Sequence, residues 1–295
     1  MLGIWNLNKR SYFHMKDLTI GIIGGTGRMG QRLVSFFEDA GYQTLIASRR
    51  TSLRPLDLSQ KSDVVVLSVP INVVEEIIAE IGPHIREDSL LMDVSSLKTR
   101  VMELMLKHTK SSVIGTHPLF GPNTRSIKNH TVVLCPGRGD KWFAWLTNLL
   151  KEKGVKVKIT TPEEHDRMMS IVQGLTHLST IALAYTMKTL NVNIDESLEY
   201  ATPIYRLKLN IMGRLFAQNL SLYRDIEILN PYVREVATTF LHSVNKIAKM
   251  VEEGDMDKFA ECLETIGDFV GDFRPIGLKE TNRLFEEMLD NKDTF

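Results

Sequence analysis

The sequence predicts an α/β protein, with a doubly wound, mostly parallel sheet in its first half and an all-helical second half. Two observations support this fold class. In the first half, short and wholly apolar runs alternate with stretches of helical periodicity, as buried parallel strands and their crossover helices do. After residue 162 the strand pattern stops and helical periodicity continues to the end. The 295 residues therefore divide into two expected domains, 16–162 and 163–295.

The elements follow one another in a regular order. Apolar residues at helical spacing predict helices over 31–40, 73–81 and 100–108, and Gly41 is the predicted C-cap of the first. From 163 to 190 the pattern predicts one long helical segment that only Gly174 interrupts. The predicted strands cover 18–23, 43–47, 63–70, 89–94, 113–114, 131–135 and 155–159.

A glycine-rich turn joins the first strand to the first helix and fits the spacing G-x-G-x-x-G. Between a strand and a helix, such a turn presents backbone N–H groups and the helix N-terminus to a pyrophosphate. We therefore expect a Rossmann-type, dinucleotide-binding domain rather than a merely structural turn. The expected cofactor ligands are in this turn and where the third strand ends: Gly25, Thr26, Gly27, Arg28, Met29, Gly30, Ser68 and Pro70.

The residues after the second strand bear on the choice of cofactor. NAD-preferring sites commonly place an acidic residue there to accept hydrogen bonds from the adenosine ribose. This chain has Ser48, Arg49, Arg50 and Thr51 instead. Two guanidinium groups and two hydroxyls suit a 2′-phosphate better than a neutral diol, which favours NADP over NAD. The alternative is that both arginines are solvated loop charges.

A histidine stands at the end of a short apolar run and directly before a proline. His117 follows the short run Val113-Ile114, and Pro118 ends the strand. Ligands of open α/β sheets lie beyond the carboxyl ends of the strands, so the imidazole can act there as a general base near neutral pH. The alternative is a loop histidine that bonds the backbone. Ser96, after the neighbouring strand, either joins His117 in function or caps the helix that begins near Thr99.

Composition excludes several other classes of protein. The 36 basic and 36 acidic side chains balance, which gives no electrostatic reason to expect nucleic acid or an anionic membrane as a partner. Cys135 and Cys262 form no C-x-x-C pair, so neither a disulfide framework nor a metal site is expected. No apolar run approaches the roughly 20 residues of a membrane span. The stretch up to His14 does not resemble a signal peptide, Met15 could be the natural start, and a cytoplasmic location is expected.

Several motifs together resemble those of prephenate dehydrogenases, and the resemblance extends from Leu18 to about Arg274. It implies oxidative decarboxylation of prephenate to 4-hydroxyphenylpyruvate in tyrosine biosynthesis, with NADP or NAD as hydride acceptor. Arogenate, with an amino group in place of the keto group, is the alternative substrate. The motifs are the glycine turn, Asp93 to Lys98, Gly115 to Pro122, His165-Asp166, Gln173 to His177, Pro203 to Leu207 and Gly213 to Gln218.

The resemblance also implies roles for individual residues. His117 would be the catalytic base that accepts the proton of the substrate hydroxyl, and Ser96 would bond the same hydroxyl or hold the imidazole. Arg214 occupies an apolar helical window, where an unpaired guanidinium would be costly to bury, so it should hold a substrate carboxylate unless it forms a salt bridge within its domain. Weaker candidates for substrate binding are Lys98 and Arg206, either of which could instead be a surface charge or part of a structural pair. Gln173 and His177 share a helical face and are further candidates, with packing in the core as the alternative for His177.

Two other hypotheses remain open from the sequence. The glycine turn with Ser48-Arg49-Arg50 also resembles the NADP site of deazaflavin-dependent NADP reductases. A non-catalytic NADP sensor would need neither His117 nor a residue that holds the substrate carboxylates. Relatives often carry a chorismate mutase or a C-terminal regulatory domain, and from its length neither is expected in this chain. The helical domain of the family usually forms an intertwined dimer, so a homodimer is expected.

Overall fold

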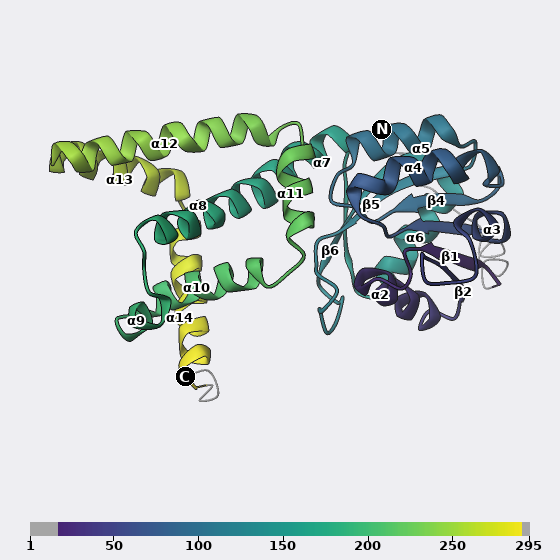
Figure 1. Ribbon diagram of the computed structural model, residues 1–295, viewed down its shortest axis with the longest axis horizontal. Helices are drawn as coiled ribbons and strands as arrows, with labels where there is room; N and C mark the ends of the chain where they lie inside the picture. The colour runs from purple at the N-terminus through teal and green to yellow at the C-terminus, as the bar shows by residue number, and fades with distance from the viewer. Residues whose placement is uncertain (1–16, 291–295) are drawn as a thin grey trace. The chain divides into compact units, whose positions relative to one another are not determined.

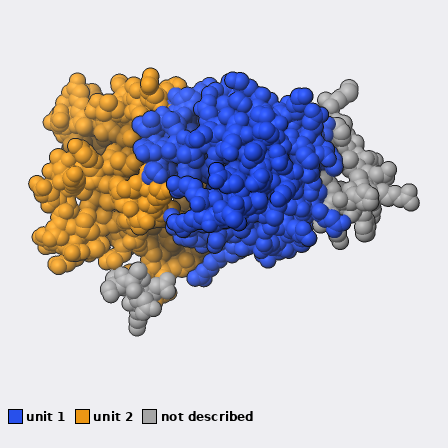
Figure 2. Space-filling view, turned by 45° about the vertical axis from the view of Figure 1, so that its right-hand side comes forward, with its two compact units in different colours: residues 1–174, 221–232 blue, residues 175–220, 233–295 orange. Residues whose placement is uncertain are grey.

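The computed structural model describes residues 17–290, and the expectations about the N-terminal stretch up to Met15 lie outside that range. The chain forms two compact units, which Figure 2 colours separately. Unit 1 comprises the described residues up to Gly174 together with Ser221–Tyr232. Unit 2 comprises Leu175–Leu220 and the described residues from Val233. The division predicted from the sequence, 16–162 and 163–295, follows the change from strands to helices and stays a prediction.

Unit 1 is built on a seven-stranded sheet with the order β2-β1-β3-β4-β5-β6-β7. Neighbouring strands are parallel, except that β6 runs antiparallel to β5. The carboxyl ends of β1 to β5 therefore meet at one edge, where an open α/β sheet binds its ligands, and β6 and β7 end at the opposite edge. The strands are β1 (Thr19–Ile23), β2 (Gln43–Ala47), β3 (Val64–Leu67), β4 (Leu90–Asp93), β5 (Ser112–Pro118), β6 (Thr131–Arg138) and β7 (Lys156–Ile159).

Helices cover both faces of this sheet, as Figure 1 shows. One face packs against α2 (Arg28–Glu38) and α6 (Asp140–Glu152). The other packs against α3 (Pro55–Lys61), α4 (Ile71–Ile81) and α5 (Thr99–His108), with a 3-10 turn over Gly82–His84. The central strands are therefore buried on both sides, which explains why their sequences are apolar without alternation.

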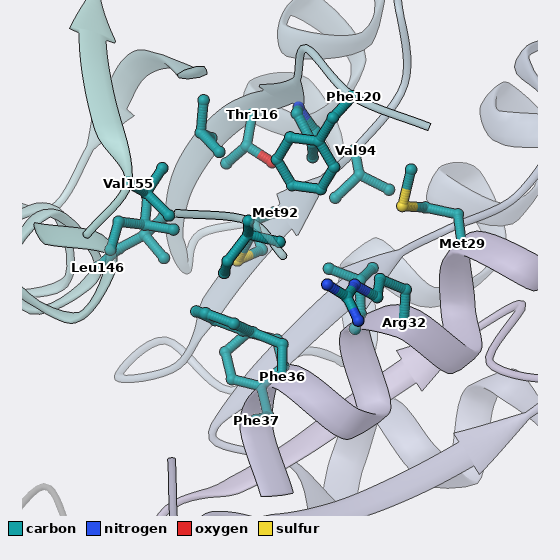
Figure 3. Close-up of a pocket in the computed structure, with 15 residues that line it drawn as sticks. Met29, Arg32, Phe36, Phe37, Met92, Val94, Thr116, Phe120, Leu146 and Val155 are labelled. Carbon is teal, nitrogen blue, oxygen red and sulfur yellow. The ribbon is translucent and has the colours of Figure 1, made fainter. Parts of the chain in front are cut away.

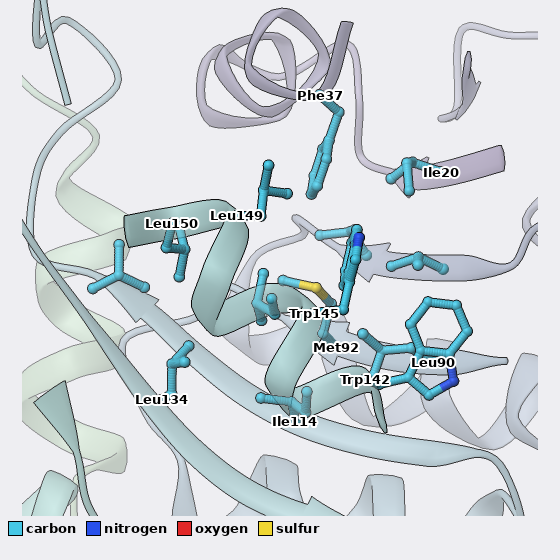
Figure 4. Packing of buried hydrophobic residues seen from close by; sticks show 14 of the residues in the cluster. Ile20, Phe37, Leu90, Met92, Ile114, Leu134, Trp142, Trp145, Leu149 and Leu150 are labelled. Atoms are coloured by element: carbon cyan, nitrogen blue, oxygen red, sulfur yellow. The ribbon is translucent and has the colours of Figure 1, made fainter. Parts of the chain in front are cut away.

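Aromatic side chains of α2 and α6 fill the core on the first face (Figure 4). Phe37 and Trp145 stack with their ring centroids 6.4 Å apart. The indole N–H groups of Trp142 and Trp145 both have hydrogen-bond acceptors. Trp145 Nε1 donates to the Tyr42 hydroxyl at 3.0 Å, and Trp142 Nε1 donates to the Asp88 carbonyl at 2.9 Å. Large buried aromatic side chains with hydrogen-bonded N–H groups hold a helix in one position, so α6 is fixed against the sheet.

Helices make up the rest of the described chain. The segment predicted as one helix from 163 to 190 is continuous but not uniform, since a π-helical stretch over Ser170–Leu175 contains Gly174. Many apolar side chains of unit 2 are exposed, for example Phe269 at 90% and Leu263 at 56%. The helices are α7 (Pro162–Met169), α8 (Thr176–Thr189), α9 (Ile194–Glu199), α10 (Pro203–Phe216), α11 (Leu220–Leu229), α12 (Val233–Glu253), α13 (Met256–Val270) and α14 (Phe273–Asp290).

The predicted fold class is confirmed: a doubly wound sheet is followed by helices to the end of the described residues. The sequence did not predict α3, whose seven residues are too few to show a helical period, and it also missed the 13-residue α6. The prediction of Gly41 as the C-cap of the first helix was wrong, because α2 ends with Asp39 as its C-cap. Within residues 17–290, no helix combines the length and apolar character that a membrane span requires.

Candidate active site

The turn between β1 and α2 packs so tightly that it excludes side chains at several positions. A Cβ on Gly30 would lie 2.3 Å from the Gly24 carbonyl oxygen, and one on Gly25 would lie 2.5 Å from Ile46 Cγ2. Gly27 is the N-cap of α2 and contributes no side-chain cap. The turn therefore leaves backbone N–H groups of the first helical turn available to an anion, and its donors fit the pyrophosphate of a dinucleotide.

Residues at the carboxyl end of β3 support the glycine turn. Ser68, directly after β3, donates its backbone N–H to the Ile23 carbonyl at 2.8 Å. Gly24 has φ +85°, and a Cβ there would lie 2.1 Å from the Ser68 carbonyl oxygen. Pro70 is the N-cap of α4. Gly24, which the prediction omitted from the cofactor ligands, is thus the residue that lets the β1 turn pass beside the end of β3.

The turn after β2 holds the predicted phosphate ligands in an ordered loop. The Ser48 N–H donates to Thr51 Oγ1 at 2.7 Å, and the Arg50 N–H donates to Ser48 Oγ at 3.1 Å. Arg49 and Arg50 are exposed at the surface of this turn. The loop therefore presents two guanidinium groups from a fixed backbone, and it carries no carboxylate that would repel a phosphate.

An apolar pocket lies beside the cofactor turn, between α2, α6 and the sheet (Figure 3). Met29 lines it from the first turn of α2, and Thr116 and Pro118 line it from β5. Side chains alternate along a strand, so the residue between these two, His117, projects from the opposite face of the sheet. The pocket and the imidazole consequently lie on different sides of β5.

His117 is buried and forms a chain of hydrogen bonds with two residues of α7. Its Nδ1 lies 2.9 Å from His165 Nε2, and His165 Nδ1 lies 2.8 Å from Asp166 Oδ1. The ring centroids of the two histidines are 5.1 Å apart. The segment that positions them begins with a capping box, in which Thr161 and Glu164 satisfy each other's backbone N–H groups. The end of β5 and the start of α7 thus jointly fix the orientation of His117.

The surroundings of His117 favour its neutral form. Burial lowers the pKa of His117 well below its usual value of 6.5, and the nearby His165 and Lys98 lower it further. For Asp166, burial alone would raise the pKa. Hydrogen bonds from His165, Thr99 and Lys98 outweigh burial, so that the pKa of this carboxyl is lowered. The chain of hydrogen bonds therefore ends on an ionised carboxylate and begins on a neutral imidazole.

Asp166 also caps helix α5. Its two carboxylate oxygens accept the backbone N–H groups of Lys98 and Thr99, each at 2.8 Å. This corrects one alternative from the sequence: Ser96 does not cap α5, because a carboxylate from α7 does so. A negative charge at a helix N-terminus is favourable, which helps to keep Asp166 ionised although it is buried. Ser96 is half-buried, and its role toward the substrate stays a prediction.

Lys98 is wholly buried and forms an ion pair with Asp93 at the end of β4. Its Nζ contacts Asp93 Oδ2 and lies 3.2 Å from Ser95 Oγ. Ser95 Oγ in turn donates to Asp93 Oδ2 at 2.5 Å. The geometry matches the structural pair that the sequence left open as an alternative. Binding of a substrate carboxylate by Lys98 stays a prediction, and the structure adds no support for it.

The other predicted substrate ligands lie on α8, on α10 and in the π-helical stretch. Gln173 belongs to that stretch in unit 1, and its Oε1 is buried without a hydrogen-bond partner among residues 17–290. His177 and Arg206 are half-buried on helices of unit 2. Arg214 is exposed, which corrects the expectation that its apolar window buries it. Ile211 and Phe216, which flank Arg214 on α10, are also exposed. The apolar sequence around Arg214 therefore does not mean that this part of the helix is buried.

The sequence prediction assigned no role to the two residues that orient His117 by hydrogen bonds. His165 and Asp166 entered it only as part of a motif, with no role assigned. The separation of 48 residues between His117 and His165 gives no local pattern that links them. The one available signal was the capping box at Thr161 and Glu164, which starts a helix at that point and so directs the next residues toward the sheet.

Comparison with known proteins shows the family to which the chain belongs. Residues 44–159 match the prephenate dehydrogenase nucleotide-binding domain, and residues 161–265 match the prephenate dehydrogenase dimerization domain. The T-protein of Haemophilus influenzae is 32% identical, over 92% of this chain and 72% of its own length. The chain belongs to the prephenate dehydrogenase family. The family resemblance predicted from the motifs is thereby confirmed.

Other relatives and structures in the same family are similar to this chain. A protein of Methanocaldococcus jannaschii named probable arogenate/prephenate dehydrogenase is 38% identical over 86% of this chain, which spans 61% of that protein's length. Prephenate dehydrogenase from A. aeolicus, solved with hydroxyphenyl propionate and NAD+, has a TM-score of 0.70 at 19% identity, covering 85% of this chain and 96% of that one. Synechocystis arogenate dehydrogenase has a TM-score of 0.65 at 21% identity, covering 85% and 98%. At these identities the two structures establish a shared fold.

Proposed function

We propose that this chain is an NADP-preferring prephenate dehydrogenase that oxidises and decarboxylates prephenate to 4-hydroxyphenylpyruvate. The observation that carries the proposal is the buried chain His117–His165–Asp166 at the carboxyl end of β5, in a member of this family. The glycine turn would hold the dinucleotide, whose nicotinamide would supply the acceptor for the hydride of C4 of the substrate ring. The residues of the chain must then take up the proton of the C4 hydroxyl and hold the two carboxylates.

His117 is proposed as the base for that proton. The ionised Asp166 accepts the Nδ1–H of His165, which leaves a lone pair on His165 Nε2. That lone pair accepts the Nδ1–H of His117, so that His117 Nε2 keeps a free lone pair. The low pKa keeps this lone pair available at neutral pH. His165 and Asp166 are thus positioning residues, which select the tautomer in which His117 can accept a proton.

Ser96 and Arg214 are proposed to complete substrate binding. Ser96 follows β4, the strand next to β5, and its half-buried hydroxyl can bond the same substrate hydroxyl that His117 deprotonates. Arg214 supplies an exposed guanidinium, which can hold a carboxylate through two parallel hydrogen bonds. Loss of carbon dioxide then makes the ring aromatic, so decarboxylation needs little help beyond binding in the correct orientation.

A homodimer is part of the proposal. The second matched region is described as a dimerization domain, and it covers residues 161–265. Apolar side chains of α12 and α13 in this region are exposed in the single chain, including Val251 at 65% and Leu263 at 56%. Exposed apolar surface of this kind is typical of a subunit interface, and a second copy of the chain is the partner that would cover it.

A turnover assay with four substrate and cofactor combinations tests the proposal. Prephenate and arogenate are each supplied with NADP and with NAD, and formation of the reduced cofactor is followed by absorbance. We expect the highest kcat/KM with prephenate and NADP. Arogenate dehydrogenase is the second candidate, because the name of the M. jannaschii relative includes both substrates. Faster turnover of arogenate would favour that candidate, and no turnover of either substrate would contradict the proposal.

A further inference from the structure

A second, polar hollow of about 240 Å³ lies beside α2, and none of His117, His165 and Asp166 lines it. Three segments of unit 1 line it: the middle of α2, the loop that follows β5, and the residue after α6. Each segment contributes cations, namely Arg32 from α2, Arg125 and Lys128 from the loop, and Lys153 after α6. The proposed function uses none of these four residues.

The positive charge in this hollow is only partly compensated within the described chain. Asp39 is the one acidic side chain among the residues that line it, against four cations. No ion pair among residues 17–290 involves any of the four. Four cations that converge beside a single carboxylate leave an excess of positive charge, so the arrangement favours an anion between them.

The hydrogen bonds in the hollow hold the cations but leave donors available. Arg32 Nη2 donates to the Arg125 carbonyl at 3.3 Å, and Lys153 Nζ donates to the Asp39 carbonyl at 3.0 Å. Arg32 Nε is buried and has no hydrogen-bond partner among the described residues. A buried guanidinium N–H without a partner is unfavourable, so the contacts of Arg32 within the described chain leave its hydrogen-bonding capacity unsatisfied. Figure 3 shows the Arg32 side chain rising from α2 beside Phe36.

From these observations we propose that the hollow is a binding site for a phosphate group, as free phosphate or as a phosphate monoester. The four cations approach from three segments of the chain, which suits a tetrahedral anion with several oxygens better than a planar carboxylate. The volume also leaves space for a small organic group on the ester oxygen. Such a ligand would join α2, the helix of the cofactor turn, to the loop that follows His117.

Titration calorimetry on the full chain tests this site. The glycine turn could also hold phosphate, so inorganic phosphate and glycerol 3-phosphate are titrated both without NADP and with NADP at saturation, at constant ionic strength. Malonate serves as a carboxylate dianion. The variants are Arg32→Met, which keeps the apolar stem, and Lys128→Gln, whose exposed side chain can change without affecting folding. Lys151→Gln is the matched control, because Lys151 is an exposed cation of α6 that does not line the hollow.

The proposal predicts that at least one of the two phosphates binds with NADP present, and more tightly than malonate does. Each of Arg32→Met and Lys128→Gln should weaken that binding about tenfold or more, since each removes a charged hydrogen bond. Lys151→Gln should leave it unchanged. Preference for glycerol 3-phosphate would identify a monoester as the ligand, and preference for inorganic phosphate would identify the free anion. Binding that NADP abolishes, that the variants do not alter, or that malonate matches would overturn the proposal.

Discussion

His117, His165 and Asp166 lie within the packed interior of unit 1, whereas Arg49 and Arg50 lie exposed on the turn after β2. The chain itself supplies every hydrogen bond that orients the first group. The two guanidinium groups, by contrast, are placed only by the backbone of their turn. A buried set of this kind is prepared before any ligand arrives, whereas the exposed pair depends on the ligand. Changes to the buried set should therefore affect turnover strongly, and changes to exposed cations should affect binding or selectivity.

The largest effect is expected at His117. Replacement by Ala removes the proposed base, so kcat should fall by about a hundredfold or more, the usual contribution of a positioned base. NADP binding, measured by fluorescence titration, should stay within about twofold of the wild type because the cofactor turn is separate. His84→Ala, at an exposed histidine, is the control and should leave kcat unchanged. Unchanged turnover in His117→Ala would remove this residue from the mechanism.

The next effect concerns Arg214, an exposed cation of unit 2. Arg214→Ala should raise KM for prephenate about ten- to a hundredfold, because a hydrogen bond to a charged group contributes about 1.5 to 3 kcal/mol. KM for NADP should hardly change. Lys208→Ala, at an exposed cation of the same helix, should alter neither constant. Equal losses for both ligands would show that Arg214 does not bind prephenate.

Asp166 connects catalysis to stability, because it orients His165 and caps α5. Asp166→Ala removes both functions and should lower the free energy of unfolding by about 1 to 2 kcal/mol, as loss of an N-cap does. Asp166→Asn keeps an acceptor for the cap but no longer fixes the tautomer. We expect it to keep most of the stability, measured by thermal unfolding, and to lose about tenfold or more in kcat. Full activity of Asp166→Asn would contradict the positioning role.

The smallest effect is expected in the exposed cofactor turn. NADP should exceed NAD in kcat/KM by about tenfold, if one charge-assisted contact contributes about 1.5 kcal/mol. The double variant Ser48→Asp, Arg49→Ala should reverse this order, because it adds repulsion as well as removing attraction. Steady-state kinetics with both cofactors measure the ratio. A wild-type enzyme that uses NAD equally well would show that these arginines only face solvent.

The same contrast explains which parts of the site the sequence could predict. The glycine turn and the Ser48–Thr51 turn are local patterns that directly follow short apolar runs, so both were found from adjacent residues. His117 was found because Pro118 marks the end of a strand. The partners of His117 come from α7, however, and only the sheet and its packing bring Asp166 to the N-terminus of α5.

Burial in unit 2 was less predictable than in unit 1. Apolar strands of the sheet are covered on both faces by their own crossover helices, so apolar sequence and burial coincide. In the helical unit, apolar side chains such as Phe216 and Phe269 remain exposed in the single chain. The expectation that Arg214 is buried failed for this reason: sequence periodicity shows that a face is apolar, but it does not show what covers that face.

The pH dependence of kcat/KM with prephenate and NADP tests most directly whether His117 acts as a neutral base. Protonation of His117 removes its free lone pair, so activity must be lost as the pH falls through its pKa and retained above it. Because this pKa is well below 6.5, the rate should stay constant from neutral pH down through 6.5 and fall only at lower pH. The residual activity of His117→Ala should lack this acidic limb. An acidic limb centred at or above pH 6.5, or an unchanged limb in the variant, would contradict the account.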